Sequence, residues 1–168
     1  MFKNRKLLLS MLGASFLYAL LHLISLPHLS QLAGQPLPNP LFGGYGREGL
    51  LELLTELGPA GRAYYLSIQL PLATLFPLFF ALMTFQIFKT YLADKTYLLL
   101  LPILSFSAAY LENGVLLHSL LSFPNLSQTL LNLGNLARGV KSLAYGLIFL
   151  ILVLLVVRSA LSFLLSKR

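Results

Sequence analysis

Four stretches of this chain are each long and apolar enough to cross a lipid bilayer. They cover residues 7–26, 64–88, 97–121 and 135–158. A transmembrane helix needs about 20 predominantly apolar residues, because each residue adds only about 1.5 Å of rise. The whole chain is 57% hydrophobic and only 10% charged, which is outside the balance of a water-soluble domain. The sequence therefore predicts an all-α fold: a four-helix transmembrane bundle forming one integral membrane domain, 1–168.

The distribution of cations predicts how this bundle is oriented. Basic residues are concentrated in the cytoplasmic loops of membrane proteins. One side of the predicted bundle carries only two cations in its loops, Arg47 and Arg62. The other side carries eight: Lys3, Arg5, Lys6, Lys89, Lys95, Arg158, Lys167 and Arg168. We therefore expect both termini to be cytoplasmic. No cleavage site of small residues follows the first stretch, so we interpret it as an uncleaved helix rather than a signal peptide.

The net charge of +7 does not indicate a nucleic-acid-binding protein. The cations lie at the ends of apolar stretches, and no basic face with interleaved aromatic residues is present. The expected partners are therefore membrane lipids and no nucleic acid. A homo-oligomer or a membrane partner protein remains open.

The outer connection, residues 27–63, is predicted to contain an extracytoplasmic amphipathic helix. Its first half, QPLPNPLFGGYG, is interrupted by proline and glycine and should be irregular. Its second half, REGLLELLTELG, places three glutamates on one side and leucines on the other, and Gly58-Pro59 should end it. This helix is either a lid over the bundle or a helix on the membrane surface, and the sequence slightly favours the surface position.

The fourth stretch contains basic residues that are expected to lie inside the bundle. Only 142–157 is uncharged, which is too short to span comfortably. The upstream sequence has no proline, and Ser127 is a good N-cap candidate. A helix from about Gln128 would carry Arg138 and Lys141 into the membrane.

A single carboxylate, Glu112, lies within the third stretch. It is the only formal charge from Thr96 to Ala137, and an isolated charge at that depth costs roughly 2–4 kcal/mol. The short connection SFPNLS makes the third and fourth helices antiparallel neighbours. Glu112 is then expected to pair with Arg138 or Lys141.

Other polar residues are predicted at a similar level in the outer half of the bundle. They are Asn113 beside Glu112, Tyr145 one turn from Lys141, Tyr18 and His22 on the first helix, and Gln69 on the second. Two interpretations stay open. The group is either a satisfied network that fixes helix register, or a pocket for a lipid head group or small polar or anionic ligand.

The sequence gives less support to catalysis or cofactor binding than to ligand binding. The chain has no cysteine and no nucleophile, zinc-protease or paired-aspartate motif, and no metal site is predicted. A lipid-modifying enzyme using Glu112 with His22 or His118 is the alternative function. No cofactor is expected, and a b-type haem held by His22 and His118 is the one option that the histidines leave open. A small transporter is a third function, which at four helices would require an oligomer.

Two segments carry a resemblance to known sequences. GYGREGLLELLTELGPAGRAYYL, followed by a proline-containing apolar helix, and AAYLENGVLL resemble small uncharacterised bacterial four-helix integral membrane proteins. The resemblance implies a bacterial cytoplasmic membrane protein and supplies no activity or cofactor. It also implies recurrent polar positions at Tyr45, Arg62, Tyr65, Glu112, Asn113 and Lys141.

Overall fold

The computed structural model describes residues 5–34 and 46–165, and this part of the chain is helical with no strand. Within it, four helices are long and apolar enough to cross a membrane, judged by length and composition: Arg5–Ala33, Gly58–Tyr91, Thr96–Ser122 and Gln128–Leu165. The predicted all-α class and the four apolar helices are therefore confirmed.

Two of the long helices are built from three segments each. The first joins α1 (Arg5–Ala19), a π-helical segment η1 (Leu20–Ser25) and α2 (Leu26–Ala33). The second joins α4 (Gly58–Tyr64), a second π-helical segment η2 (Tyr65–Gln69) and α5 (Leu70–Tyr91). Between them lies α3 (Arg47–Glu56). The third long helix is α6 (Leu100–Ser122) after a 3-10 turn η3 (Thr96–Leu99), and the fourth is α7 (Gln128–Leu165).

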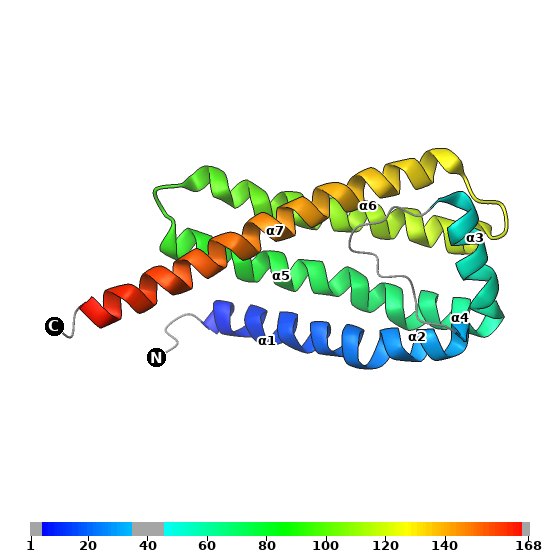
Figure 1. The fold of residues 1–168 in the computed structure, drawn as a ribbon, viewed down its shortest axis with the longest axis horizontal. Helices are drawn as coiled ribbons and strands as arrows, with labels where there is room; N and C mark the ends of the chain where they lie inside the picture. Colours follow the sequence, from blue (N-terminus) through cyan, green and yellow to red (C-terminus); the bar gives the residue numbers. More distant parts are fainter. Residues whose placement is uncertain (1–4, 35–45, 166–168) are drawn as a thin grey trace.

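The long helices pack in chain order as antiparallel neighbours. α1 packs on α5, α5 on α6, and α6 on α7, the last pair sharing the most extensive contact. Figure 1 shows that the start of α1, the α5–α6 connection and the end of α7 lie at one end of the bundle. The helices α2, α3 and α4 and the α6–α7 connection lie at the opposite end. The two ends of the described chain therefore lie at the same end of the bundle, as an even number of antiparallel helices requires.

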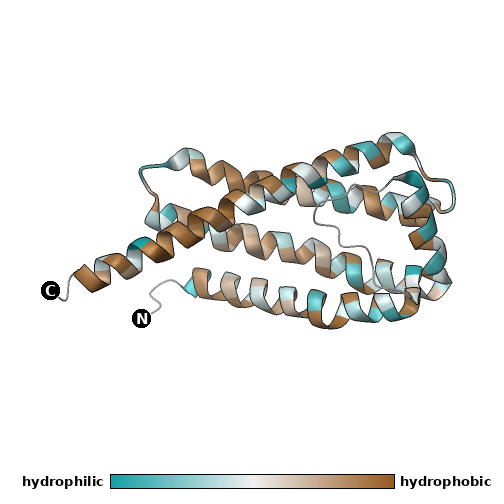
Figure 2. Cartoon of the chain, viewed as in Figure 1, coloured by the Kyte–Doolittle hydropathy of each residue, from teal (hydrophilic) through white to brown (hydrophobic). Residues whose placement is uncertain are grey.

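Large apolar side chains are exposed along the bundle, as expected for helices that cross a membrane. Figure 2 shows long hydrophobic stretches along the bundle, most continuous in the second half of α7, and hydrophilic residues gathered at its ends. Exposed large apolar side chains occur on all four long helices, including Phe16, Leu82, Leu104 and Phe149. Water would solvate such a surface poorly, whereas acyl chains are as apolar as leucine.

The helices extend beyond the predicted stretches, mainly at the outer connection. The first long helix runs to Ala33 and the second begins at Gly58, so both ends of the predicted loop 27–63, residues 27–33 and 58–63, belong to the long helices. The segment expected to be irregular, 35–46, lies outside the described residues except for Gly46. The predicted start of the fourth helix is confirmed, because α7 begins at Gln128 and the N–H of Leu130 donates to Ser127 Oγ at 3.5 Å.

Both π-helical segments end two residues before a proline. The sequences are Ser25-Leu26-Pro27 and Gln69-Leu70-Pro71, and in each the central leucine N–H bonds to the carbonyl five residues back. Proline has no N–H to continue the α-helical ladder, and a π segment is one way in which a helix adjusts around it. At Pro71 the second long helix accommodates the proline in this way.

The amphipathic helix α3 lies across the end of the bundle that carries α2, α4 and the α6–α7 connection (Figure 1). Its leucines Leu50, Leu53 and Leu54 are buried together with residues of α2, α6, α7 and the α6–α7 connection. Gly58, with φ of +60°, ends this segment and starts α4, which is the reversal that Gly58-Pro59 predicted. The apolar face of α3 therefore packs on protein. This is the lid position and not the membrane-surface position that the sequence slightly favoured.

Two arginines tie α3 to its surroundings. Arg47 Nε donates to the carbonyl of Leu126 at 3.2 Å, which joins the start of α3 to the α6–α7 connection. Arg62 Nη1 donates to the carbonyl of Leu54 at 2.6 Å, and its guanidinium lies 4.2 Å from the ring centroid of Phe123. The contacts of Arg47 with Leu126 and of Arg62 with Phe123 join elements distant in sequence, so no local pattern reveals them.

Candidate functional site

Glu112 lies at the centre of the α6–α7 contact. It is 5% exposed and belongs to a buried stripe of α6 that also includes Ser105, Ala108, Ala109 and Val115. These residues recur at intervals of three and four, so they share one face of the helix. Their small side chains let α7 approach closely, as packing between membrane helices favours.

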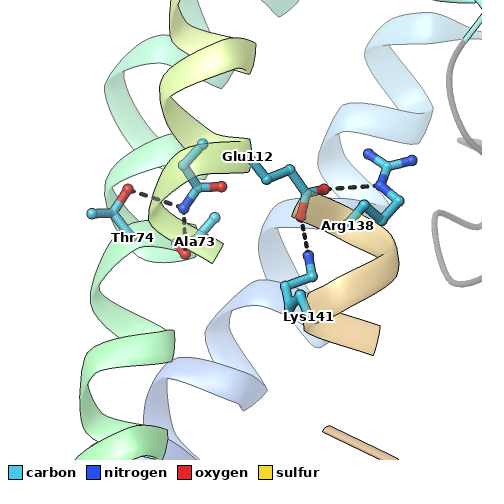
Figure 3. A network of polar contacts seen from close by, with 6 residues as sticks. Ala73, Thr74, Glu112, Arg138 and Lys141 are labelled. Atoms are coloured by element: carbon cyan, nitrogen blue, oxygen red, sulfur yellow. Dashed lines mark hydrogen bonds and ion pairs between the residues drawn. The ribbon is translucent and has the colours of Figure 1, made fainter. Parts of the chain in front are cut away.

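Both oxygens of the Glu112 carboxylate are paired with cations from α7. Arg138 Nε donates to Oε1 at 2.9 Å, and Lys141 Nζ contacts Oε2. Figure 3 shows Glu112 between the two basic side chains, with Lys141 one turn further along α7. We call these three residues the charged cluster. The structure thus brings the carboxylate together with both of the cations proposed from helical spacing.

The charged cluster holds one anion and two cations. The Arg138 side chain is 6% exposed and that of Glu112 7%, whereas 25% of the Lys141 side chain is exposed. The four long helices contain no other carboxylate, because Glu48, Glu52 and Glu56 lie on α3 and Asp94 lies in the α5–α6 connection. The cluster therefore carries a formal charge of +1, and Lys141 is its most accessible member.

A glycine on α7 sets the distance between the two helices beside the cluster. A Cβ placed on Gly134 would lie 2.9 Å from Val115 Cγ1, closer than two carbons can approach without displacement. Gly134 therefore lets α7 lie against Val115, one turn from Glu112. The close approach shortens the span that Arg138 must bridge.

Asn113, next to Glu112, faces α5 and has a structural role. Its Nδ2 donates to the carbonyl of Ala73 at 2.9 Å and to Thr74 Oγ1 at 3.3 Å. Pro77 lies four residues after Ala73 inside α5 and has no N–H for that carbonyl. Asn113 therefore satisfies the acceptor that the proline leaves unpaired. Sequence reasoning missed this pairing, although a polar residue opposite a helix proline was a usable signal.

A small pocket lies beside the charged cluster on the side towards α3. Glu112, Leu116, Gly134, Asn135 and Arg138 are among its lining residues, and its volume is about 10 Å³. This is close to the minimum space for one water molecule. In the described conformation the pocket cannot hold a lipid head group.

Among the described residues, the structure records no direct contact of Tyr145 or Gln69 with the Glu112 carboxylate. Tyr145 is half-buried, one turn of α7 beyond Lys141, and its ring packs edge-on against Phe80 with centroids 4.9 Å apart. Gln69 is 6% exposed at the end of η2, and its Oε1 has no hydrogen-bond partner among the described residues.

The prediction that Tyr18 and His22 join the charged cluster is wrong. Tyr18 is 53% exposed, and His22 is exposed, stacked on the Tyr18 ring at 4.0 Å with Nδ1 3.0 Å from the Tyr18 carbonyl. The buried face of the first helix is formed instead by Leu17, Leu21 and Ser25, and it faces α5 and η2. Tyr18 and His22 each follow a buried leucine by one residue, which turns them by about 100° to the edge of that face.

The two histidines considered for haem do not fit its axial positions. His118 on α6 and His22 on η1 are both exposed, and His22 is occupied by its contacts with Tyr18. Axial imidazoles would have to face each other across a sheltered groove. In the described ranges, no three His, Asp or Glu side chains gather in a way that could hold a metal ion.

The recurrent polar positions implied by the resemblance are distributed over several contacts. Glu112 and Lys141 lie in the charged cluster, Asn113 contacts α5, and Arg62 contacts α3. Tyr65 packs against the leucine core beneath α3. Tyr45 lies outside the described residues.

Comparison with known proteins adds no family to this description. No protein-family model, curated protein or solved structure matches the chain. A functional assignment therefore rests on the geometry and charge of the cluster.

Proposed function

We propose that this is an integral membrane protein of the bacterial cytoplasmic membrane that binds an anionic group, from a lipid or a small ligand, at the charged cluster. Four helices cross the membrane, and both termini lie on the cytoplasmic side. The cation bias supports this orientation, because Arg5, Lys6, Lys89, Lys95 and Arg158 belong to the helix ends and the connection of one side. α3 then lies on the extracytoplasmic side.

The contacts between helices support a position for the cluster in the outer third of the membrane. Asn113 contacts Thr74, so Glu112 lies at nearly the same level as Thr74 on α5. Lys89 marks the cytoplasmic end of α5, fifteen residues further along the chain (89 − 74). At about 1.5 Å per residue the cluster lies about 22 Å from that boundary, in a hydrocarbon core of about 30 Å.

The single observation that carries the proposal is the excess positive charge of the cluster. Glu112 neutralises one cation, and the four long helices supply no second carboxylate. A net charge in hydrocarbon is costly, so an anion beside Lys141 would complete the neutralisation. Lys141 is the expected point of contact because a quarter of its side chain is accessible.

Lipid binding in nanodiscs tests the proposal. We expect the wild-type protein to retain phosphatidylglycerol over phosphatidylcholine in native mass spectrometry, and Lys141→Met to lose that preference several-fold. Lys95→Met, which removes an exposed lysine of the α5–α6 connection, is the matched control. Competition by inorganic phosphate would indicate a small anion instead of a lipid. Equal retention by wild type and Lys141→Met, with no effect of phosphate, would overturn the proposal.

The orientation can be tested separately because the chain has no cysteine. A cysteine introduced at Glu48 on α3 should react with a membrane-impermeant thiol reagent in intact cells. A cysteine introduced at Asp94 should react only after lysis. The reverse pattern would show that the bundle is inverted.

The two other functions considered gain no support from contacts among the described residues. An enzyme pairing Glu112 with His22 or His118 would need an imidazole near the carboxylate, and both histidines are exposed while Glu112 pairs with cations of α7. A transporter would need further copies to enclose a path.

A further inference from the structure

Two small pockets lie on the same side of α6 and share one residue. The pocket beside the charged cluster is lined by Leu116 together with Glu112 and Arg138. The second pocket, also of about 10 Å³, is lined by Leu116 and by leucines of α3, including Leu50 and Leu54. A continuous strip of α6 therefore runs from the charged cluster to the underside of α3.

The contacts of α3 with the bundle are of a kind that another apolar group can replace. Its leucines pack against aliphatic side chains of α2, α6 and α7, and such contacts have no directional requirement. The hydrogen bonds from Arg47 to the Leu126 carbonyl and from Arg62 to the Leu54 carbonyl add polar contacts near its two ends. The opposite face of α3 is exposed and carries Glu48 and Glu52.

We infer that α3 is a movable lid over a site for a single-chain anionic amphiphile, such as a long-chain carboxylic acid. The chain of the ligand lies between α3 and α6, where the leucines of α3 pack in the described structure. Its anionic end reaches the charged cluster. This inference rests on the proposed function and adds the class of ligand and the element that admits it.

The size of the pockets requires α3 to move. Each pocket is near the limit for a single water molecule, so the described conformation is closed. In a water-soluble protein, moving several leucines from a buried position into water would carry a large free-energy cost. At a membrane surface the leucines can enter the acyl-chain boundary, so that cost is largely cancelled. α3 is amphipathic and can occupy that position while its glutamates remain in water.

The order of apolar and charged groups along α6 indicates which class of amphiphile can bind. A bilayer phospholipid places its head group at the surface and its chains towards the midplane. The strip of α6 has the opposite order, because Ser119 and Leu120 beneath α3 lie outward of Glu112. A single-chain acid that binds with its carboxylate inward fits the whole strip. A two-chain phospholipid in its bilayer orientation, even with its head group at Lys141, would place no chain beneath α3.

A tryptophan reporter tests where the chain of the ligand lies. The protein has no tryptophan, so Leu51→Trp, at a half-buried position of α3, gives a single fluorophore. We expect 9,10-dibromostearic acid to quench this fluorescence at least several-fold more effectively than its methyl ester or a dibrominated phosphatidylcholine. Lys141→Met should abolish the difference between acid and ester. Leu161→Trp, at the exposed inner end of α7, should be quenched by the three probes alike.

Movement of α3 has an independent readout that does not depend on the tryptophan variant. Spin labels on cysteines introduced at Glu52 and Asn132, both exposed, report the distance between α3 and the start of α7. Stearic acid should lengthen this distance. Arg62→Gln, which removes the bond to the Leu54 carbonyl, should tighten apparent binding several-fold because the open state becomes more populated.

The outcomes separate this inference from the proposed function. If anion binding depends on Lys141 but the α3 reporter is not quenched and the distance does not change, the lid inference is wrong and the proposed function remains. If quenching is equal for the acid and its methyl ester, the ligand class is wrong. If no binding depends on Lys141, both fail.

Discussion

Asn113 is expected to stabilise the bundle because Pro77 leaves a carbonyl without a donor. Removing the amide in Asn113→Ala eliminates the bonds to the Ala73 carbonyl at 2.9 Å and to Thr74 Oγ1 at 3.3 Å. Hydrogen bonds between membrane helices contribute about 0.6 kcal/mol on average and up to about 1.7 kcal/mol. The bond to Ala73 should lie at the upper end, because water does not replace it in hydrocarbon. We therefore expect a total loss of about 1–2 kcal/mol.

The same reasoning predicts an interaction between Asn113 and Pro77. In Pro77→Ala the restored N–H can bond to the Ala73 carbonyl within α5. Asn113→Ala should then cost only the weaker bond to Thr74. A double-mutant cycle should give a coupling free energy of about 1 kcal/mol, which is about a five-fold change in the unfolding equilibrium.

Unfolding in mixed micelles with increasing sodium dodecyl sulfate, followed by circular dichroism, measures each corner of the cycle. Pro102→Ala is the matched control, because Pro102 is also a buried helix proline and lies eleven residues, about 16 Å, before Asn113 on α6. Its cycle with Asn113→Ala should show no coupling. If Asn113→Ala costs the same with and without Pro77, the assignment of Asn113 as the donor to the orphaned carbonyl is refuted.

Three further predictions concern the contact between α6 and α7 and the start of α7. Glu112→Gln should destabilise the protein by about 3 kcal/mol in the same assay, because it leaves two cations without a carboxylate. A loss below about 1 kcal/mol would mean that the two cations find other partners. Gly134→Leu should cost at least about 1–3 kcal/mol, since its Cβ would lie 2.9 Å from Val115, and Val115→Ala should recover part of this. Gly146→Leu, where nothing lies within 4 Å, should be tolerated, and equal losses at the two glycines would contradict the close approach. Ser127→Ala should cost about 0.5–1 kcal/mol through loss of the α7 cap, seen as a lower midpoint.

Much of the charged cluster could be anticipated from local spacing. Arg138 and Lys141 are three residues apart on one helix, and a short connection places that helix beside Glu112. Helical period and loop length therefore indicated the level and the neighbour of the carboxylate. The placement of Tyr18 and His22 failed because period alone does not say which face of a helix is buried. That face was decided by contact with α5 and η2.

The position of α3 shows a similar limit of prediction from the sequence. The alternation of glutamate and leucine predicted an amphipathic helix, and Gly58-Pro59 predicted its end. The same pattern fits a membrane surface and a protein surface equally well, because both offer apolar contact to one face and water to the other. The contacts of Arg47 with the Leu126 carbonyl and of Arg62 with the Phe123 ring, both in the α6–α7 connection, indicate that α3 uses the protein surface.

The sequence alone determined the long apolar helices, the asymmetric distribution of cations and the isolation of Glu112, because each depends on composition along one segment. Only the tertiary structure decided which partners satisfy buried polar groups: both cations for Glu112, and the Ala73 carbonyl for Asn113. The physical reason is that a helix satisfies its own backbone locally. A buried side chain or a carbonyl freed by proline must find its partner on another helix, and that choice depends on how helices distant in the chain pack.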